Sequence, residues 1–421
     1  MTSLIYNLTI LCLILPCYVY VGYPLLLWIL NKIVKAKSVQ RADITPEVAL
    51  MVSCYNEADV IRAKLDNCLA LNYPKDKIKI IAISDGSDDG TDEIIKEYEG
   101  LGVCLIRQEG RLGKTSGLNL GVAATSADII VFSDANAMYD SNAIRMLTRN
   151  FNDPKVGYVV GAALYTDGDN NSAAKSEDTY WKYEVFLKQL ETQLHSVVGG
   201  DGAIYAIRRE LYEPLQAQDI NDFVNPLQII AKGYRGIFDV DAKCFEETAG
   251  DFDKEARRKQ RIVNRSFRGL LRVKEVLNPL NYGFYSLEII SHKLLRWLIP
   301  FFLVGIALGS SYLAHMGLAL FQALVILEAV FLWLATIGYF KASNENISPI
   351  FFYPYYFLVV NYHSLIGVIQ ALQGNIQVTW SSPRSNSAGR KITNRKELLM
   401  GVSLVLFSIY VFVDSVAGLL K

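Results

Sequence analysis

The chain of 421 residues is too long for one small domain, and 51% of its residues are hydrophobic. Its 42 lysines and arginines balance 42 aspartates and glutamates, which argues against a protein that binds nucleic acid through a general positive field. Because the apolar residues gather towards both ends, we expect an integral membrane protein with a soluble middle. The six cysteines form no Cys-x-x-Cys pair, which fits a reducing compartment and argues against a disulfide framework or a thiolate zinc site.

An uncharged segment opens the chain. Residues 3–30 hold no charged side chain, and about 20 apolar residues suffice to cross a bilayer. No charged stretch precedes this segment and no small-residue cleavage site follows it, so we assign residues 1–31 to a retained transmembrane helix. Basic residues come directly after it, at Lys32, Lys35, Lys37 and Arg41. By the positive-inside rule they place the amino terminus outside and the middle of the chain in the cytosol.

The soluble middle alternates strand-like and helical patterns. Short β-branched and apolar runs occupy residues 48–52, 80–83, 103–106 and 129–132. This alternation predicts a doubly wound, mostly parallel α/β sheet. Polar residues follow three of the runs: Glu57, Asp85 and Asp134. Because ligands bind beyond the carboxyl ends of parallel strands, we expect these three acids to share one site.

Four short motifs occur in order along this middle part. They are Tyr55-Asn56-Glu57, Ser84-Asp85-Gly86-Ser87, Arg111-x-Gly113-Lys114 with Asn119, and Asp134-Ala135-Asn136. In order and spacing the set resembles the family 2 glycosyltransferases of the GT-A fold. The resemblance extends over nearly the whole chain and is closest to the membrane-embedded branch that includes cellulose, hyaluronan and poly-N-acetylglucosamine synthases. It implies a cytosolic GT-A domain over residues 45–272, with transmembrane and interfacial α-helices around it.

The resemblance implies a nucleotide-sugar donor, most simply a UDP-sugar, and a divalent metal. The donor-binding residues it implies are Tyr55, Glu57, Asp85, Lys114, Asp134 and Arg258. Mg²⁺ or Mn²⁺ bridges a diphosphate through hard oxygen ligands, here Asp134 and Asn136. The family motif is Asp-x-Asp, so Asn136 is a departure, because its carbonyl can ligate a cation but brings no charge. The alternative for Asn136 is a helix N-cap.

Two further positions carry the chemistry that the resemblance implies. Asp222 matches the general base of the family's Thr-Glu-Asp motif, which takes the proton from the acceptor hydroxyl during inversion. A helix cap is the alternative for Asp222, and Asp219 is its nearest rival as the base. Arg261 takes the arginine place of the family's Gln-x-x-Arg-Trp element and would stabilise the departing diphosphate. Arg258 takes the glutamine place and Ile262 the tryptophan place, so the aromatic surface is missing there or supplied elsewhere.

The acceptor side is expected between a helix and a glycine-rich loop. The pattern of residues 179–194 predicts an amphipathic helix, and in the family this helix lines the acceptor site, which points to Trp181 and Glu184. The alternative for such an aromatic stripe is core packing. Gly200 and Asp201 belong to the loop that, by the resemblance, lies beneath the acceptor sugar.

The last part of the chain, residues 276–421, is expected to hold the remaining membrane elements. We predict an amphipathic helix at the membrane surface over residues 276–296. Spans are predicted at residues 297–314, 317–340 and 398–420. Residues 350–372 are long enough to span, but a span there would place a basic loop outside, so an interfacial or re-entrant helix is preferred. In the family the next cytosolic loop, with Trp380 and Arg384, gates the nucleotide pocket.

The leading functional hypothesis is an inverting glycosyltransferase. It would move a sugar from a nucleotide-sugar to the end of a growing cell-surface polysaccharide, with extrusion of the chain as a further hypothesis. One alternative is transfer of a single sugar to a membrane lipid, and another is an inactive transferase that acts in transport or as a scaffold. Expected partners are the donor, a polysaccharide or lipid acceptor and membrane lipids, but no nucleic acid, with an accessory subunit left open. The expected location is the plasma (inner) membrane, multi-pass, with the catalytic domain in the cytosol.

Overall fold

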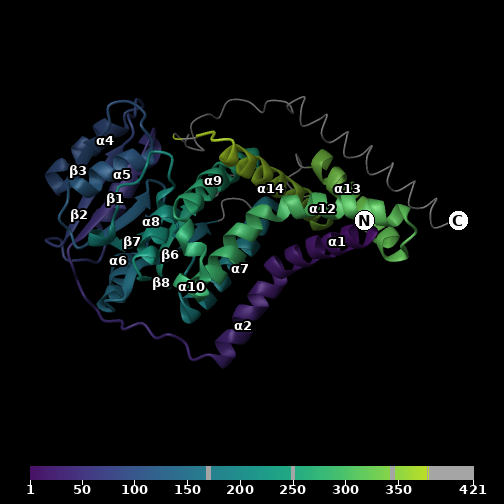
Figure 1. Ribbon diagram of the computed structural model, residues 1–421. Helices are drawn as coiled ribbons and strands as arrows, with labels where there is room; N and C mark the ends of the chain where they lie inside the picture. Colours follow the sequence, from purple (N-terminus) through teal and green to yellow (C-terminus); the bar gives the residue numbers. More distant parts are fainter. Residues whose placement is uncertain (167–171, 248–251, 342–346, 377, 379–421) are drawn as a thin grey trace.

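The computed structural model describes residues 1–166, 172–247, 252–341, 347–376 and 378 (Figure 1). In these residues the middle of the chain forms a sheet flanked by helices, and long helices extend from it to one side. The predicted last span at 398–420 and the predicted gating-loop residues Trp380 and Arg384 lie outside the described residues.

One sheet of eight strands organises the soluble part. The strands are β1 (Val48–Cys54), β2 (Ile78–Ser84), β3 (Val103–Arg107), β4 (Ile129–Asp134), β5 (Met138–Tyr139), β6 (Val156–Thr166), β7 (Tyr205–Arg208) and β8 (Arg235–Glu247). Their order across the sheet is β3-β2-β1-β4-β7-β6-β8-β5. All seven residues of β1 are buried, as expected for an apolar strand covered on both faces.

The predicted parallel arrangement holds for one half of the sheet. Strands β3, β2, β1 and β4 are parallel to one another. In the other half β7 runs antiparallel to β4 and β6, β8 runs parallel to β6, and β5 runs antiparallel to β8. The sheet is therefore mixed as a whole. Each of these antiparallel pairs joins strands that are separated by a long stretch of sequence, so no short hairpin signals them.

Helices cover both faces of the sheet, as predicted. Those of the soluble part are α3 (Ala58–Leu69), α4 (Thr91–Glu97), α5 (Lys114–Ala123), α6 (Ala143–Thr148), α7 (Ser172–Leu194), α8 (Asn221–Ala231) and α9 (Phe252–Arg272). On one face Leu50 of β1 lies in a core with Leu65 of α3. On the other face Met51 lies in a second core with Leu118 of α5. Alternate residues of one strand thus supply two cores.

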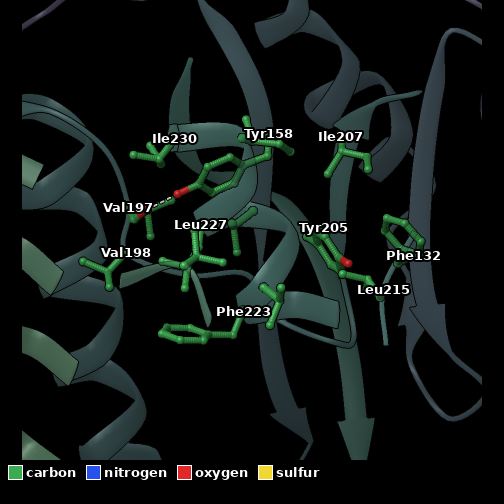
Figure 2. Close-up of a cluster of buried hydrophobic side chains, with 14 of the residues drawn as sticks. Phe132, Tyr158, Val197, Val198, Tyr205, Ile207, Leu215, Phe223, Leu227 and Ile230 are labelled. Atoms are coloured by element: carbon green, nitrogen blue, oxygen red, sulfur yellow. Dashed lines mark hydrogen bonds between the residues drawn. The ribbon is translucent and has the colours of Figure 1, made fainter. Parts of the chain in front are cut away.

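The second core fixes the start of α8 (Figure 2). Phe132 of β4 and Tyr205 of β7 stack with their ring centroids 4.7 Å apart. The Tyr205 hydroxyl accepts hydrogen bonds from the side chains of Asn221 at 2.8 Å and Asn225 at 3.1 Å. Both asparagines are buried in α8, so the sheet holds the helix end that carries Asp222.

The remaining described helices form the candidate membrane part. They are α1 (Thr2–Cys17), α2 (Tyr23–Ile33), α10 (Pro279–Tyr282), α11 (Phe284–Ile289), α12 (Leu295–His315), α13 (Ala319–Lys341) and α14 (Pro349–Leu372). Four helical stretches in the described residues are long and apolar enough to cross a membrane: Thr2–Ile33, Phe284–His315, Ala319–Lys341 and Pro349–Leu372. The stretch at the N-terminus and those over α12 and α13 overlap the spans predicted at residues 1–31, 297–314 and 317–340.

The segment predicted as one interfacial helix over residues 276–296 is divided. Gly283, with φ of +55°, separates α10 from α11, a backbone conformation that favours glycine. From Phe284 onward the chain continues through a π-helical turn into α12, so this helix begins well before the predicted boundary at 297. The break is local, because a single left-handed residue ends the first helical turns.

Helix α14 is continuous despite Pro354, and it lies against the soluble helix α9 as well as against α13. Gln260 of α9 donates to Gln370 at 3.0 Å and contacts the ring of His363 at 2.8 Å. Lys259 donates to the hydroxyl of Tyr356. The preferred interfacial or re-entrant placement of this helix remains a prediction, and α14 joins the soluble part to the membrane part.

Small residues bring α1 and α12 close together. A Cβ atom added to Gly309 would lie 2.0 Å from Oγ1 of Thr9, and one added to Gly305 would lie 2.8 Å from Sγ of Cys12. Gly305 and Gly309 stand four residues apart, on one face of α12. Close approach through a Gly-x-x-x-Gly face is a common way for membrane helices to associate.

We expect Gly309→Leu to separate α1 from α12 and to lower the free energy of unfolding by about 1–3 kcal/mol, because the new side chain overlaps Thr9. The measurement is the melting temperature of the purified protein in detergent. Leu308→Phe is the control, since Leu308 is 63% exposed on the same helix. Equal melting temperatures for the two variants would contradict this packing.

Candidate active site

Three strand ends bring the predicted acids to one edge of the sheet. In the β-sheet register Cys54 pairs with Ser84, and Ser53 pairs with Asp134. Asp85 directly follows the end of β2, and Glu57 stands three residues after the end of β1. The structure therefore places Glu57, Asp85 and Asp134 along a common edge, as the alternation of strands and helices predicts.

Asp85 is buried and organises the turn before α5. Its Oδ1 accepts hydrogen bonds from the side chain of Gln108 at 2.8 Å and from the backbone N–H groups of Leu112 at 2.8 Å and Gly113 at 2.9 Å. Its Oδ2 is buried and has no hydrogen-bond partner in the described part of the chain. Burial raises the pKa of this carboxyl, against the lowering effect of the two backbone donors. The second oxygen is thus available to accept a hydrogen bond from a ligand.

The loops after β1 and β2 interlock beside Asp85. Asn56, which has a positive φ of 53°, donates from its side chain to Asp88 at 2.8 Å. The guanidinium of Arg111 lies 3.8 Å from the ring centroid of Tyr55, within the range of a cation–π contact. Glu57 occupies the N-cap position of α3. Tyr55 and Glu57 are therefore held at the rim of the same edge as Asp85.

Lys114, Asp134 and Asp222 converge around Gly202. Lys114, the first residue of α5, donates to Oδ1 of Asp134. A Cβ atom added to Gly202 would lie 3.3 Å from Oδ2 of Asp222, 3.5 Å from Oδ2 of Asp134 and 3.7 Å from Nζ of Lys114. The loop before β7 therefore passes within van der Waals distance of a cation and two carboxylates that are far apart in the sequence.

The position of Asp222 is set by the backbone of the glycine-rich loop. Gly200 donates its N–H to the carbonyl of Asp222 at 2.5 Å, and a Cβ atom on Gly200 would lie 2.6 Å from that carbonyl. Oδ1 of Asp222 is buried without a hydrogen-bond partner in the residues described. Burial raises the pKa of the Asp222 carboxyl; Asp201 and Asp134 add to the effect, while Lys114 and Arg265 oppose it.

The helix-cap alternatives for Asp222 and Asn136 can be compared with the helix ends of the structure. The N-cap of α8 is Ile220, and no side chain caps this helix, so Asp222 is not a helix cap. Asp219, the rival for the base, accepts from the backbone N–H of Gln216 at 2.7 Å and pairs with Arg272 at 2.8 Å. Its carboxylate is therefore occupied by structural partners. Asn136 lies in the turn between β4 and β5 and caps no helix.

The predicted acceptor residues lie in different surroundings. Lys188 of α7 pairs with Asp201 at 3.5 Å and lies 4.9 Å from the ring centroid of Trp181, so these three side chains form one group beside the glycine-rich loop. Glu184 is buried and pairs with Arg296 and, at 3.1 Å, with His292. Its carboxylate joins α7 to the membrane helices, and the acceptor contact expected of Glu184 remains a prediction.

Helix α9 carries the predicted arginines. Arg258 is exposed, whereas Arg261 and Ile262 are half-buried. Sequence reasoning missed Arg265, which is buried and donates to the carbonyl of Asp219 and, at 3.1 Å, to the hydroxyl of Thr115. It ties α9 to α5 and to the segment before α8. The sequence did hold a signal for Arg265: it stands four residues after Arg261, and residues four apart lie on the same face of a helix.

Sequence reasoning also missed Glu246 on β8. This residue is only 9% exposed, and burial together with Asp134 and Asp201 raises its pKa to about 7. The sole signal in the sequence is its place two residues after the buried Cys244, on the same face of the strand. The described residues hold no group of three or more His, Cys, Asp or Glu that could hold a metal ion.

The segment after α14 reaches the nucleotide side of the site. A Cβ atom on Gly113 would lie 2.8 Å from the carbonyl oxygen of Val378. Gly113 has a φ of +90°, so both its backbone and this contact favour glycine. Val378 therefore lies beside the turn that leads into α5, and the predicted gating loop after it lies outside the described residues.

Comparison with known proteins gives the class of this domain. The family model described as glycosyl transferase family 2 matches residues 49–215. The poly-β-1,6-N-acetyl-D-glucosamine synthase of Staphylococcus aureus strain MSSA476 is 38% identical over 116 residues, which cover 27% of this chain and 28% of that protein. The protein named probable glycosyltransferase YdaM, from Bacillus subtilis strain 168, is 34% identical over 200 residues, which cover 45% and 47%. The chain thus matches a quarter to a half of the length of these relatives.

A solved structure shows the same fold over most of the chain. A mannosyltransferase from Pyrobaculum calidifontis, solved in complex with GDP-mannose and Mn²⁺, aligns with a TM-score of 0.66 and 21% identity over 87% of this chain and 99% of the other. The soluble part therefore has the GT-A fold. The family model assigns residues 49–215 to a family 2 glycosyltransferase domain, in agreement with the resemblance in the sequence.

We expect Asp85→Ala to lower the free energy of unfolding by about 1–3 kcal/mol, because it leaves the N–H groups of Leu112 and Gly113 without their acceptor. Asp85→Asn keeps an oxygen at this place and removes a charge that burial already disfavours. The melting temperature should therefore fall in the alanine variant and stay near that of the wild type in the asparagine variant. Equal losses in both would show that the charge, rather than the acceptor, holds the turn.

Proposed function

We propose that this protein is an inverting glycosyltransferase that moves a sugar from a nucleotide-sugar, most simply a UDP-sugar, to the end of a growing cell-surface polysaccharide. The observation that carries this proposal is the meeting of Lys114, Asp134 and Asp222 around Gly202 at the strand-end edge. A cation for the diphosphate, a carboxylate for a metal and a half-buried carboxylate for the proton of the acceptor suit a displacement at a sugar carbon next to a diphosphate.

The donor side is supported by the surroundings of Asp85. Its buried Oδ2 lacks a partner in the described residues, so it can accept a hydrogen bond from the N–H of a pyrimidine base. The ring of Tyr55, backed by Arg111, offers a flat surface beside it. Glu57 stands at the same rim and is proposed to contact the ribose. Lys114 is proposed to face the diphosphate.

The residues at the end of β4 fit a divalent cation. The carboxylate of Asp134 already contacts a cation in the structure, because the ammonium group of Lys114 donates a hydrogen bond to it. Asn136 adds a neutral oxygen from the same turn. One or two protein oxygens completed by phosphate and water are typical of Mg²⁺ sites. When bound, Mg²⁺ or Mn²⁺ neutralises charge that develops on the departing diphosphate. The Mn²⁺ of the mannosyltransferase structure supports a metal of this class.

Asp222 is proposed as the general base. Its carboxylate has one buried oxygen without a partner in the described residues and one oxygen facing the space at Gly202. From there it can take the proton of an acceptor hydroxyl while the nucleotide leaves from the opposite side of the sugar carbon. Arg258 and Arg261 of α9 are proposed to stabilise the diphosphate as it leaves.

The acceptor and the location rest on the relatives and the long helices. Two facts support a polysaccharide acceptor: the name of the staphylococcal synthase and the group formed by Trp181, Lys188 and Asp201 beside Gly202. The four apolar helices support a multi-pass protein of the plasma membrane, with its catalytic domain on the cytosolic side. Extrusion of the product and an accessory subunit are compatible with this arrangement and stay hypotheses.

The function is tested by sugar transfer in membranes that contain the protein. Radiolabelled UDP- and GDP-sugars are offered one by one with Mg²⁺ or Mn²⁺, and the product is sized. A water-soluble product of high molecular weight from one donor supports the proposal. A small product that extracts into organic solvent would favour a lipid acceptor. Binding of nucleotide without any transfer would favour the inactive transport or scaffold hypothesis.

We expect Asp222→Asn to lower the transfer rate by about 10²–10⁴-fold, because the amide cannot take the proton from the acceptor. Binding of UDP, measured by calorimetry, should change little, since the donor contacts proposed for Asp85 and Glu57 remain. Asp219→Asn is the matched comparison and should keep most of its activity if it folds. Transfer that survives the change at Asp222 would refute its assignment as the base.

The pH profile of transfer offers a further check. Burial raises the pKa of Asp222, and the carboxyl acts as a base only when it is ionised. The rate at low donor concentration should therefore fall as the pH drops through a pKa above about 3.9, the ordinary value for aspartate. A profile that stays level down to pH values near that of free aspartate would contradict a buried base.

A further inference from the structure

The two residues proposed as metal ligands bring only one negative charge to the metal site. Of the two ligands at the end of β4, Asp134 is a carboxylate and Asn136 is a neutral amide. A divalent cation held between a protein and a diphosphate is stabilised by nearby negative charge, including charge that does not touch it. The structure points to a second acid that comes from another strand.

Strand pairing brings Glu246 to this turn. β5 is antiparallel to β8, with Met138 opposite Phe245. Because the two strands run in opposite directions, the residue after Phe245 lies beside the residue before Met138, at the end of the turn that carries Asp134 and Asn136. Glu246 is 9% exposed there, on the face of β8 opposite to that of Phe245.

Charged groups from several elements surround Glu246. The negative charges that act on it are Asp134, from the end of β4, and Asp201, from the glycine-rich loop. The positive charges are Arg258 of α9 and Lys114 of α5. Glu246 is therefore under the influence of two negative and two positive side chains from other parts of the fold.

A buried lysine holds the same turn through a hydrogen bond to its backbone. Lys64 of α3 is fully buried and donates to the carbonyl of Ala137, the residue between Asn136 and Met138. It also interacts electrostatically with Asp134 and Glu246. Lys64 therefore holds this turn in place, and its positive charge acts on two of the acids, Asp134 and Glu246.

We propose that Glu246 supplies the second negative charge of the divalent-cation site, in place of the charge that Asn136 lacks. The inference deepens the proposed function and depends on the metal assigned there. Glu246 acts through space and through the turn between β4 and β5 rather than as a third ligand, because the described residues hold no group of three acids arranged around one point. It is a positioning residue for the metal.

The test is binding of Mn²⁺ to the full-length protein in detergent, followed by the electron paramagnetic resonance signal of free Mn²⁺, with and without UDP. Glu246→Gln keeps the shape of the side chain and removes its charge. Loss of a residue that supports a metal ligand lowers metal affinity by about 10–100-fold, and we expect a loss in this range. Glu213→Gln is the control, since Glu213 is an exposed carboxylate paired with Lys232 and should leave the affinity unchanged.

Rescue separates a charge effect from a merely structural role. Asn136→Asp restores a carboxylate in the turn, so the double variant with Glu246→Gln should regain most of the lost affinity. If Glu246→Gln does not fold, Glu246→Asp keeps the charge and should bind Mn²⁺ within a few-fold of the wild type, whereas Glu246→Ala should not. Wild-type affinity in a folded Glu246→Gln variant, no rescue by Asn136→Asp, or weak binding by Glu246→Asp would each overturn the inference.

The same experiment distinguishes this inference from the proposed function. If the wild-type protein binds no Mn²⁺ even with UDP present, the proposed metal dependence itself fails. If the wild type binds Mn²⁺ and transfers sugar but the Glu246→Gln variant binds equally well, only the role of Glu246 is wrong.

Discussion

The site depends on how the protein tolerates several acids at one edge of its sheet. Asp85, Asp134, Asp222 and Glu246 are brought together by strands and a helix start that are distant in the sequence, and carboxylates held close together in low dielectric repel one another. Backbone N–H groups stabilise the first, Lys114 pairs with the second, and burial raises the pKa of the other two. An edge of this kind is stabilised by positive charge from a ligand, which is a physical reason to expect a metal there.

Glycines make this crowding sterically feasible. At Gly200 and Gly202 the loop before β7 passes so close to α8 and β4 that added side chains would meet the carbonyl or the carboxylate of Asp222. Tyr205, just beyond this loop, then holds the asparagines of α8. The loop and the helix thus form one unit, which Tyr205 and Phe223 connect to the core shown in Figure 2.

The sequence predicts much of this arrangement because the signals are local. Apolar runs that end in Asp or Glu define β1, β2 and β4, and their parallel pairing brings Glu57, Asp85 and Asp134 to one edge. The sequence does not predict the mixed half of the sheet, because antiparallel neighbours such as β4 and β7 pair across long insertions. It also gives little sign of Glu246 or Arg265, which gain their roles from strand register and from packing between helices. The burial of Glu184 against His292 follows from the contact between α7 and the membrane helices, which no local pattern encodes.

The contact between α9 and α14 has a mechanical consequence. Two of the residues of α9 that contact α14, Lys259 and Gln260, stand between Arg258 and Arg261 on the same helix. An α-helix is stiff over one turn, so a tilt of α14 is carried to both arginines without a flexible linker in between. In a bilayer, whose thickness influences the tilt of long apolar helices, this contact would couple the tilt of α14 to the two arginines that are proposed to stabilise the diphosphate.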